Sequence, residues 1–319
     1  MIEDAGRQAE VIAMPAAGRA GTRPDTIVDG GRLGGLTYRA SSQRGLGHQE
    51  VGTPRQDAYL VRPTPDRRWL VGCVADGVSE GKLSHEAADI VCQETTVRLA
   101  RGLTGLNLDR GPEAWAELVS RWPEVAAALP WSQIVQAANA ALRRAAKTAV
   151  RQGLDRAGDA AGLAELESSW DDASARKVMS STAVVFAVGA AAAADGGHPA
   201  VVAAVAGDSA ALLLHGNEWE PLSAVKNDGV EIATTAVSPL PGPVRAAPQA
   251  RILQPGQALV VITDGLGDPL GSGGGVVGRF LATMWRQPPD ILSFAQHVGF
   301  YRKSFTDDRT AVAIWVQRP

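Results

Sequence analysis

The chain has 319 residues, of which 45% are hydrophobic and 20% charged, and its formal net charge is −3. This length can bury a sizeable core in one large domain or two small ones. The small negative charge argues against a general nucleic-acid-binding protein, which normally carries a basic excess. No apolar stretch is long enough to span a bilayer and no signal sequence is visible, so we expect a cytoplasmic protein without a membrane segment.

In chain order, residues 1–35 are rich in Gly, Ala, Asp and Arg without a sustained hydrophobic period, and we interpret them as a mostly disordered arm. Strand patterns begin at Leu36. Helical patterns follow from His85 to Arg156, strand patterns return from Met179 to Thr263, and two helical patterns precede a closing strand. Blocks of strands and helices with hairpin-length links predict an α+β layered sandwich, as a single domain over residues 36–319.

Acidic residues recur at the edges of the strand-like runs. Asp76 directly follows the apolar run Trp69–Ala75 and precedes a glycine, and the same arrangement recurs at Asp264. Asp57, Asp208 and Asp307 also border such runs. One Asp-Gly pair after a strand is usually an ordinary turn. Five carboxylates at strand ends must be paired or bind metal, because repulsion and desolvation are otherwise costly, and together they indicate a site for a hard cation.

Six motifs carry a resemblance to a known family. In chain order they are Q-D-A at 56–58, V-A-D-G-V at 74–78, S-S-T-A-V at 180–184, A-G-D-S-A at 206–210, V-I-T-D-G-L at 261–266 and D-D-R-T-A-V at 307–312. Together they resemble the metal-dependent Ser/Thr protein phosphatases of type 2C (PPM), in the form of a divergent bacterial branch. The resemblance implies a four-layer αββα sandwich, in which a central antiparallel β-sandwich is flanked by helix pairs.

The resemblance also implies a site for two Mn²⁺ or Mg²⁺ ions. By position, the ligands would be four carboxylates and one backbone carbonyl, from Asp57, Asp76, Asp264, Asp307 and Gly77. Asp208 with Asp264 would form a third, weaker metal site, and the alternative is that Asp208 hydrogen-bonds its own turn. Oxygen ligands without a Cys or His cluster favour Mg²⁺ or Mn²⁺ over Zn²⁺. A hydroxide that bridges two such cations can attack a phosphoryl group, so no side-chain nucleophile is required.

The polar loop 44–55 supplies the remaining candidates. Arg44 and Arg55 could bind the phosphate as bidentate donors, and we prefer Arg44; the alternative is a solvated surface charge. His48 is our candidate general acid, with His85 as the alternative, because the position that holds a His in some animal members is Val78 here. A loop His is more often a structural or phosphate-side donor.

Three functions are open. The first, which we favour, is hydrolysis of phosphoserine or phosphothreonine in proteins, opposing a Ser/Thr kinase in a bacterium. The second is a pseudophosphatase that binds phosphoproteins, suggested by Gln56 in place of a carboxylate and by the changed loop after Gly77. The third is a phosphatase for a small-molecule phosphomonoester. The metal site would bind its phosphate, and the variable segment 226–248 would recognise the rest of the molecule. The intact set of four carboxylates favours an enzyme, and the oligomeric state is left open.

Overall fold

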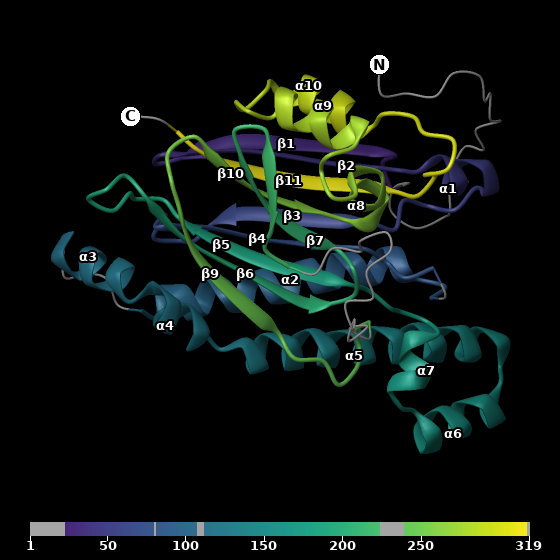
Figure 1. Ribbon diagram of the computed structural model, residues 1–319. Helices are drawn as coiled ribbons and strands as arrows, with labels where there is room; N and C mark the ends of the chain where they lie inside the picture. Colours follow the sequence, from purple (N-terminus) through teal and green to yellow (C-terminus); the bar gives the residue numbers. More distant parts are fainter. Residues whose placement is uncertain (1–22, 80, 107–111, 224–238, 318–319) are drawn as a thin grey trace.

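The computed structural model describes residues 23–79, 81–106, 112–223 and 239–317. Two antiparallel sheets lie face to face, and helices cover both outer surfaces (Figure 1). In spatial order, the first sheet contains β1 (Thr26–Leu33), β2 (Leu36–Gln43), β11 (Arg309–Val316), β10 (Gln257–Ile262), β7 (Ala210–His215) and β8 (Glu218–Pro221). The second contains β3 (Ala58–Pro63), β4 (Trp69–Ala75), β5 (Ala183–Gly189), β6 (His198–Ala206) and β9 (Ala247–Leu253).

The helices form the outer layers. The second sheet is covered by α2 (Ser84–Thr104), α3 (Pro112–Ser120), α4 (Trp122–Ala127) and α5 (Trp131–Ala157), and α6 (Ala160–Ser169) and α7 (Asp172–Arg176) follow α5. The first sheet is covered by α8 (Asp264–Leu270), α9 (Val276–Met284) and α10 (Ile291–Val298), while α1 (Leu46–Val51) lies between β2 and β3. The predicted α+β fold with four αββα layers is therefore confirmed.

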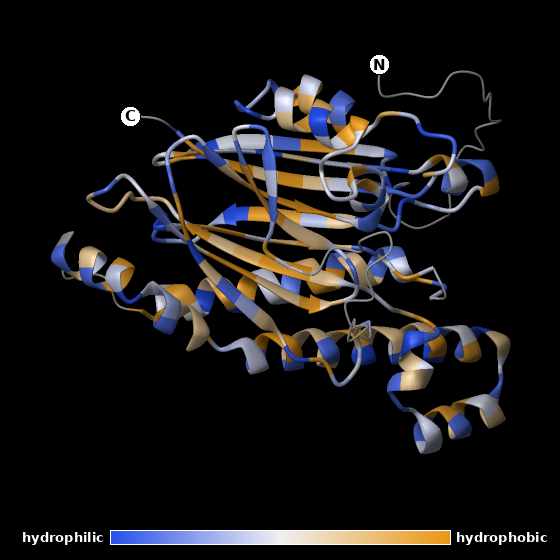
Figure 2. Ribbon diagram, in the orientation of Figure 1, coloured by the Kyte–Doolittle hydropathy of each residue, from blue (hydrophilic) through white to orange (hydrophobic). Residues whose placement is uncertain are grey.

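Apolar residues are concentrated on the strands (Figure 2), and three apolar clusters lie between the four layers. In β5, Ala183, Val185 and Ala187 face the helices, whereas Val184 and Phe186 face the other sheet. Because both faces of this strand are covered, its sequence is a continuous apolar run rather than an alternating one. The strands β4, β10 and β11 are likewise covered on both faces. β4 and β10 end shortly before a predicted carboxylate, and β11 begins shortly after one.

The N-terminal boundary was predicted too late in the chain. Residues 26–33, assigned to a disordered arm, form β1 and pair with β2 along their whole length. The strand was missed because Gly30 and Gly31 have low strand propensity and the strand is at a sheet edge, mostly exposed. These glycines leave room for long neighbours: an added Cβ would lie 3.0 Å from the Arg39 side chain at one position and 2.8 Å from Tyr38 at the other.

Other expectations fall partly outside the described residues. Residues 1–22 of the expected arm and 226–238 of the expected variable loop are among them. Within the described helices, none is both long and apolar enough to cross a membrane.

Candidate metal centre

The predicted carboxylates come together at one end of the sandwich. Asp76 follows β4, Asp208 follows β6, and Asp264 begins α8 two positions after the end of β10. Asp57 precedes β3, and Asp307 precedes β11. Because neighbouring antiparallel strands run in opposite directions, the starts of some strands lie beside the ends of others. We call this end of the sandwich, where α1 and α8 also lie (Figure 1), the site end.

Three of these carboxylates form a compact group. Asp76, Asp208 and Asp264 each present an oxygen, and the three oxygens lie within 4.8 Å of one another. All three residues are partly accessible rather than fully buried. The structure thus brings Asp208 beside the predicted ligands Asp76 and Asp264, and its metal role stays a prediction.

Asp57 lies deepest in the site, at 1% exposure. Burial is the main reason that its pKa is raised, to about 8, and the charges of Asp308 and Asp264 act in the same direction. The Thr263 hydroxyl opposes this effect by donating a hydrogen bond to Asp57 Oδ2 at 2.7 Å. The metal-free site therefore disfavours the ionised form of this carboxyl group.

The pKa of Asp76 is also raised, first by burial and then by the charges of Asp57, Asp264 and Asp307. Several acids that destabilise one another's charged forms need a cation to stay ionised together. Carboxylate oxygens are the ligands that Mg²⁺ and Mn²⁺ prefer. The donor set of this site therefore fits a hard divalent cation.

The S-S-T-A-V motif supports the backbone of Asp76. Thr182 Oγ1 accepts a hydrogen bond from the Asp76 amide at 2.9 Å, and the Thr182 amide donates to the Asp76 carbonyl at 2.7 Å. Ser181 Oγ donates to the same carbonyl at 3.0 Å, and the backbones of Ser181 and Gly77 form an antiparallel β-bridge. A side chain at Gly77 would place its Cβ 2.5 Å from the Ser84 carbonyl oxygen, so this turn requires glycine.

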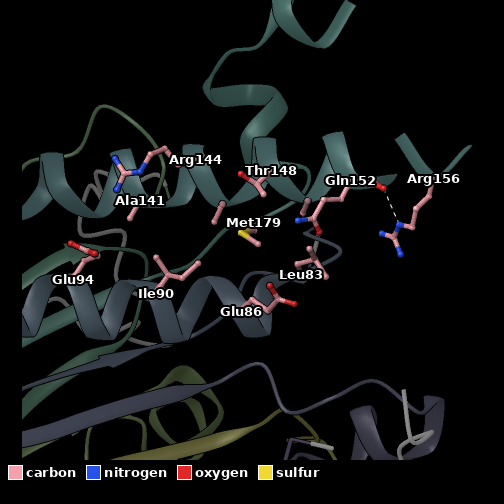
Figure 3. Close-up of a pocket in the computed structure, with 12 residues that line it drawn as sticks. Leu83, Glu86, Ile90, Glu94, Ala141, Arg144, Thr148, Gln152, Arg156 and Met179 are labelled. Carbon is pink, nitrogen blue, oxygen red and sulfur yellow. Dashed lines mark hydrogen bonds between the residues drawn. The ribbon is translucent and has the colours of Figure 1, made fainter. Parts of the chain in front are cut away.

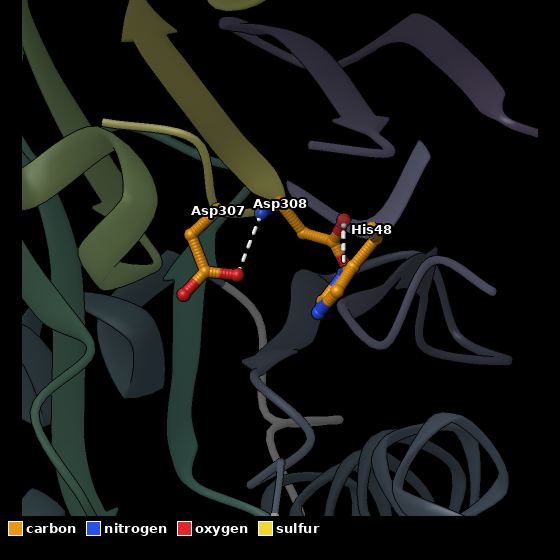
Figure 4. A group of neighbouring side chains, drawn as sticks. All are labelled: His48, Asp307 and Asp308. Carbon is orange, nitrogen blue, oxygen red and sulfur yellow. Dashed lines mark hydrogen bonds and ion pairs between the residues drawn. The ribbon is translucent and has the colours of Figure 1, made fainter. Parts of the chain in front are cut away.

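Asp308 was quoted in the motifs but not assigned a role, and it organises the loop 44–56. Its carboxylate accepts hydrogen bonds from the amides of Gly45 at 2.6 Å and Gln56 at 2.5 Å. His48 Nδ1 lies 2.9 Å from Asp308 Oδ1 (Figure 4). Burial lowers the pKa of His48, but the contact with Asp308 and the charges of Asp308, Asp307 and Asp57 together outweigh burial and raise it. His48 therefore lies within the carboxylate cluster.

The two predicted phosphate-binding arginines contact the protein backbone. Arg44 is fully buried, donates to the carbonyls of Thr53 at 2.7 Å and His48 at 2.9 Å, and lies 3.3 Å from Asp25. Arg55 is also buried and donates to the carbonyl of Asp57 at 2.6 Å. The roles of Arg44 and Arg55 in binding phosphate stay predictions.

Arg23 lies in the expected arm and is not among the predicted site residues. Its guanidinium donates to the Asp57 carbonyl at 2.6 Å and pairs with Asp89 of α2. The N-terminal segment thus reaches the backbone of the most buried carboxylate. Only a long-range contact reveals this, because residues 23 and 57 share no motif.

Two hollows differ in their relation to the site. A cavity of about 170 Å³ beside Asp307 is lined by the loop residues Arg44 and Leu46 and by Phe300 and Arg309. A groove of about 700 Å³ lies between α2 and α5 (Figure 3). None of the predicted site residues lines this groove, whereas Arg44 and Asp307 line the smaller cavity.

Comparison with known proteins agrees with this geometry. The family model for protein phosphatase 2C matches residues 44–290, and the chain belongs to this family of metal-dependent phosphatases. A search of curated proteins finds no match. Among solved structures, a bacterial serine phosphatase is similar, with a TM-score of 0.53 and 11% identity over 88% of this chain and 98% of that one.

A second similar structure is the catalytic domain of the serine threonine protein phosphatase PstP in complex with two manganese ions. It has a TM-score of 0.50 and 16% identity over 89% of this chain and 99% of that one. At these identities both structures show the fold alone. The family match confirms the resemblance stated from the six motifs.

Proposed function

We propose that the chain hydrolyses phosphoserine or phosphothreonine in proteins, with divalent cations held by Asp57, Asp76, Asp264 and Asp307 and by the Gly77 carbonyl. The observation that carries the proposal is the convergence of these strand-end carboxylates, two of which have raised pKa values without a cation. Membership of a family of metal-dependent phosphatases supports it. Asp208, beside Asp76 and Asp264, would contribute to a third, weaker site.

Mn²⁺ or Mg²⁺ at such a site supplies Lewis-acid chemistry, lowering the pKa of water and neutralising charge on a phosphoryl group. The residues of the chain would position the substrate beside it. The cavity lined by Asp307 would offer space for part of the substrate. Arg44 lines that cavity and would bind the phosphate if its guanidinium exchanged a backbone carbonyl for a phosphate oxygen. Arg55 would then support the site through its hydrogen bond to the backbone carbonyl of Asp57.

His48 is our proposed proton donor to the leaving group. Its Nδ1 faces Asp308 Oδ1 at 2.9 Å, and this ion pair of the protonated ring would leave Nε2 to hold a proton toward the substrate. The side chain is 16% exposed, so substrate can reach it. The alternative, His85, is paired with Glu86 rather than with the carboxylate cluster.

The test is hydrolysis of para-nitrophenyl phosphate by the purified protein with Mn²⁺, with Mg²⁺ and with EDTA. Asp264→Asn removes a proposed ligand, and Asp195→Asn, at an exposed turn, is the matched control. We expect cation-dependent turnover that falls at least about a hundredfold in D264N and is unchanged in D195N. Turnover that survives EDTA and D264N would overturn the metal assignment.

Substrate class is tested next by comparing phosphopeptides with sugar and nucleotide phosphates under the same conditions. We expect phosphopeptides to be preferred, as for an enzyme that opposes a Ser/Thr kinase in the bacterial cytoplasm. We place the proposed catalytic domain from β1 onward, because β1 belongs to the first sheet. Preference for a small phosphomonoester would replace the protein substrate while leaving the metal site in place.

One observation favours a second candidate, a phosphoprotein-binding module. Gln56 is a neutral residue next to Asp57, so this position cannot supply a carboxylate ligand. It is 7% exposed, and its Oε1 has no hydrogen-bond partner among the described residues. This candidate predicts metal-independent phosphopeptide binding by calorimetry together with no turnover in Mn²⁺ or Mg²⁺. Turnover in either metal would exclude it as the sole function.

A further inference from the structure

Arg309, the first residue of β11, lies next to the candidate metal centre and is buried, with the residue 7% exposed. Nε donates to the Gly265 carbonyl at 3.1 Å, and Nη2 donates to the Phe305 carbonyl at 2.6 Å. The guanidinium carbon lies 4.3 Å from the centre of the Phe300 ring. One side chain thus connects the first turn of α8 with the segment that precedes β11.

The two connected segments carry proposed metal ligands. Gly265 directly follows Asp264, and Phe305 precedes Asp307 by two positions. The segments are in close contact, because a Cβ at Gly265 would lie 1.9 Å from the Asp308 carbonyl oxygen. The relative position of Asp264 and Asp307 therefore depends on how firmly these segments are held together.

The β-ladder ends just before these two segments. Pairing of β10 with β11 ends at Ile262, and one further pair of bonds joins Thr263 and Thr310 before the chain turns into α8. Beyond Thr263, the hydrogen bonds of the Arg309 side chain to the Gly265 and Phe305 carbonyls join the first turn of α8 to the segment before β11. We propose that Arg309 is a positioning residue that fixes the Asp264 turn against the Asp307 segment and so sets the affinity of the centre for divalent cations.

The chemistry of arginine suits this task. Its planar fork can donate to two carbonyl oxygens at fixed angles, whereas the lysine ammonium is a compact point charge on a flexible stem. Burial lowers the pKa of Arg309 to about 10, against the attraction of Asp307, so the side chain remains charged at neutral pH. The proposal rests on the assignment of Asp264 and Asp307 as ligands in the proposed function.

The test measures Mn²⁺ affinity of the full chain by calorimetry, with thermal unfolding recorded for every variant. Arg309→Met removes both hydrogen bonds and the charge, and Arg309→Lys restores the charge alone. The matched control is Arg39→Met, because Arg39 likewise donates to two backbone carbonyls, of Pro289 at 2.7 Å and Tyr38 at 2.8 Å, but holds the segment before α10.

We expect R309M to weaken Mn²⁺ binding by about 10- to 100-fold, as is typical for partners of metal ligands, and R309K to weaken it less. R39M should lose stability and keep the wild-type affinity. Should R309M not fold, R309K decides the question, since its charge cannot replace both hydrogen bonds and binding should still weaken by about threefold or more.

Wild-type affinity in every folded Arg309 variant would overturn the inference alone, and so would an equal loss in R39M. A wild-type chain that binds no Mn²⁺ would overturn the proposed function, and the inference with it. The readout is binding, so the two failures are distinguishable without an activity assay.

Discussion

The two ends of the β-sandwich differ in the partners of their polar side chains. At the site end, Asp57 and Asp76 lie among other carboxylates, and their pKa values are raised. The opposite end, which we call the turn end, consists of the turns at 34–35, 64–68, 190–197 and 254–256. There, His198 Nδ1 lies 2.7 Å from the Gly189 carbonyl oxygen, and Asp195 Oδ1 accepts a hydrogen bond from the Gly197 amide at 2.9 Å.

This difference shows which end is arranged for stability alone. The polar groups named at the turn end, buried His198 and exposed Asp195, are matched with backbone partners. Buried acids at the site end are matched with other acids, which is unfavourable unless a ligand compensates. The site end therefore holds an electrostatic cost that the rest of the fold must offset and that a bound divalent cation would remove.

The largest expected effect comes from the same substitution made at each end. In EDTA at pH 7, Asp57→Asn should raise the free energy of unfolding by about 2–4 kcal/mol, because it removes the buried acid whose pKa is raised to about 8. Asp195→Asn should change it by no more than about 0.5 kcal/mol, because Asp195 is exposed. Urea unfolding measures both.

Addition of Mn²⁺ completes this comparison. The cation should stabilise the wild type and D195N but not D57N, in which a proposed ligand is missing. Loss of stability in metal-free D57N would contradict the idea that the site end carries an electrostatic cost.

The second effect is the pH dependence of the metal-free wild type. The pKa of Asp57 is near 3.9 in the unfolded chain and about 8 in the folded one, so unfolding releases a proton between these values. Stability should therefore fall as pH rises from about 4 to about 8, by up to about 1.4 kcal/mol per pH unit for this group, and Asp76 acts in the same direction.

Urea unfolding in EDTA at several pH values between 5 and 8 measures this slope. D57N should show a shallower slope than the wild type, and saturating Mn²⁺ should flatten the wild-type profile. Identical slopes for wild type and D57N in EDTA would show that Asp57 titrates normally in the folded chain.

A smaller effect concerns the hydroxyl group that partly compensates Asp57. Thr263 is fully buried, donates to Asp57 Oδ2 and accepts from the Thr310 amide at 3.0 Å. Thr263→Val should cost about 1–3 kcal/mol at pH 7, because it leaves both partners without their hydrogen bond. Thr263→Ser keeps the hydroxyl group and is the control; equal losses in the two variants would point to packing instead.

The sequence was sufficient to predict the layers and the location of the carboxylates. An apolar run followed by an acidic residue marks the end of a buried strand, whichever strands it pairs with. Asp76 and Asp264 could therefore be identified as strand-end carboxylates without knowing the sheet order. The order of six motifs then fixed the family. Neither inference depends on the direction in which a side chain points.

The parts that were missed depend on contacts between distant residues. Asp308 binds the Gln56 amide across 252 positions, and nothing in the D-D pair indicates which carboxylate accepts that bond. The guanidinium groups of Arg44 and Arg55 contact backbone carbonyls, a geometry that residue type alone does not predict. The strand β1 was missed because its partner β2, rather than its own glycine-containing sequence, holds it in place.

The smallest expected effect is at the turn end and has the opposite sign. His198 is 3% exposed, and burial lowers its pKa, although the bond with the Gly189 carbonyl opposes this. A folded pKa below 6.5 means that the unfolded chain gains a proton first on acidification. The stability that His198 contributes is therefore present above pH 6.5 and is lost as the pH falls below it.

His198→Asn keeps an amide donor near the position of Nδ1 and removes the titration. At pH 8 the variant should be less stable than the wild type by about 1 kcal/mol, because it loses ring packing. This difference in the free energy of unfolding should narrow as the pH falls to 5, because protonation of His198 favours the unfolded chain and the variant lacks this group. Subtracting the two profiles in EDTA cancels the contribution of the distant carboxylates. A gap that stays constant would mean that His198 has the same pKa in the folded and unfolded chain, and the contrast between the two ends would then rest on the carboxylates alone.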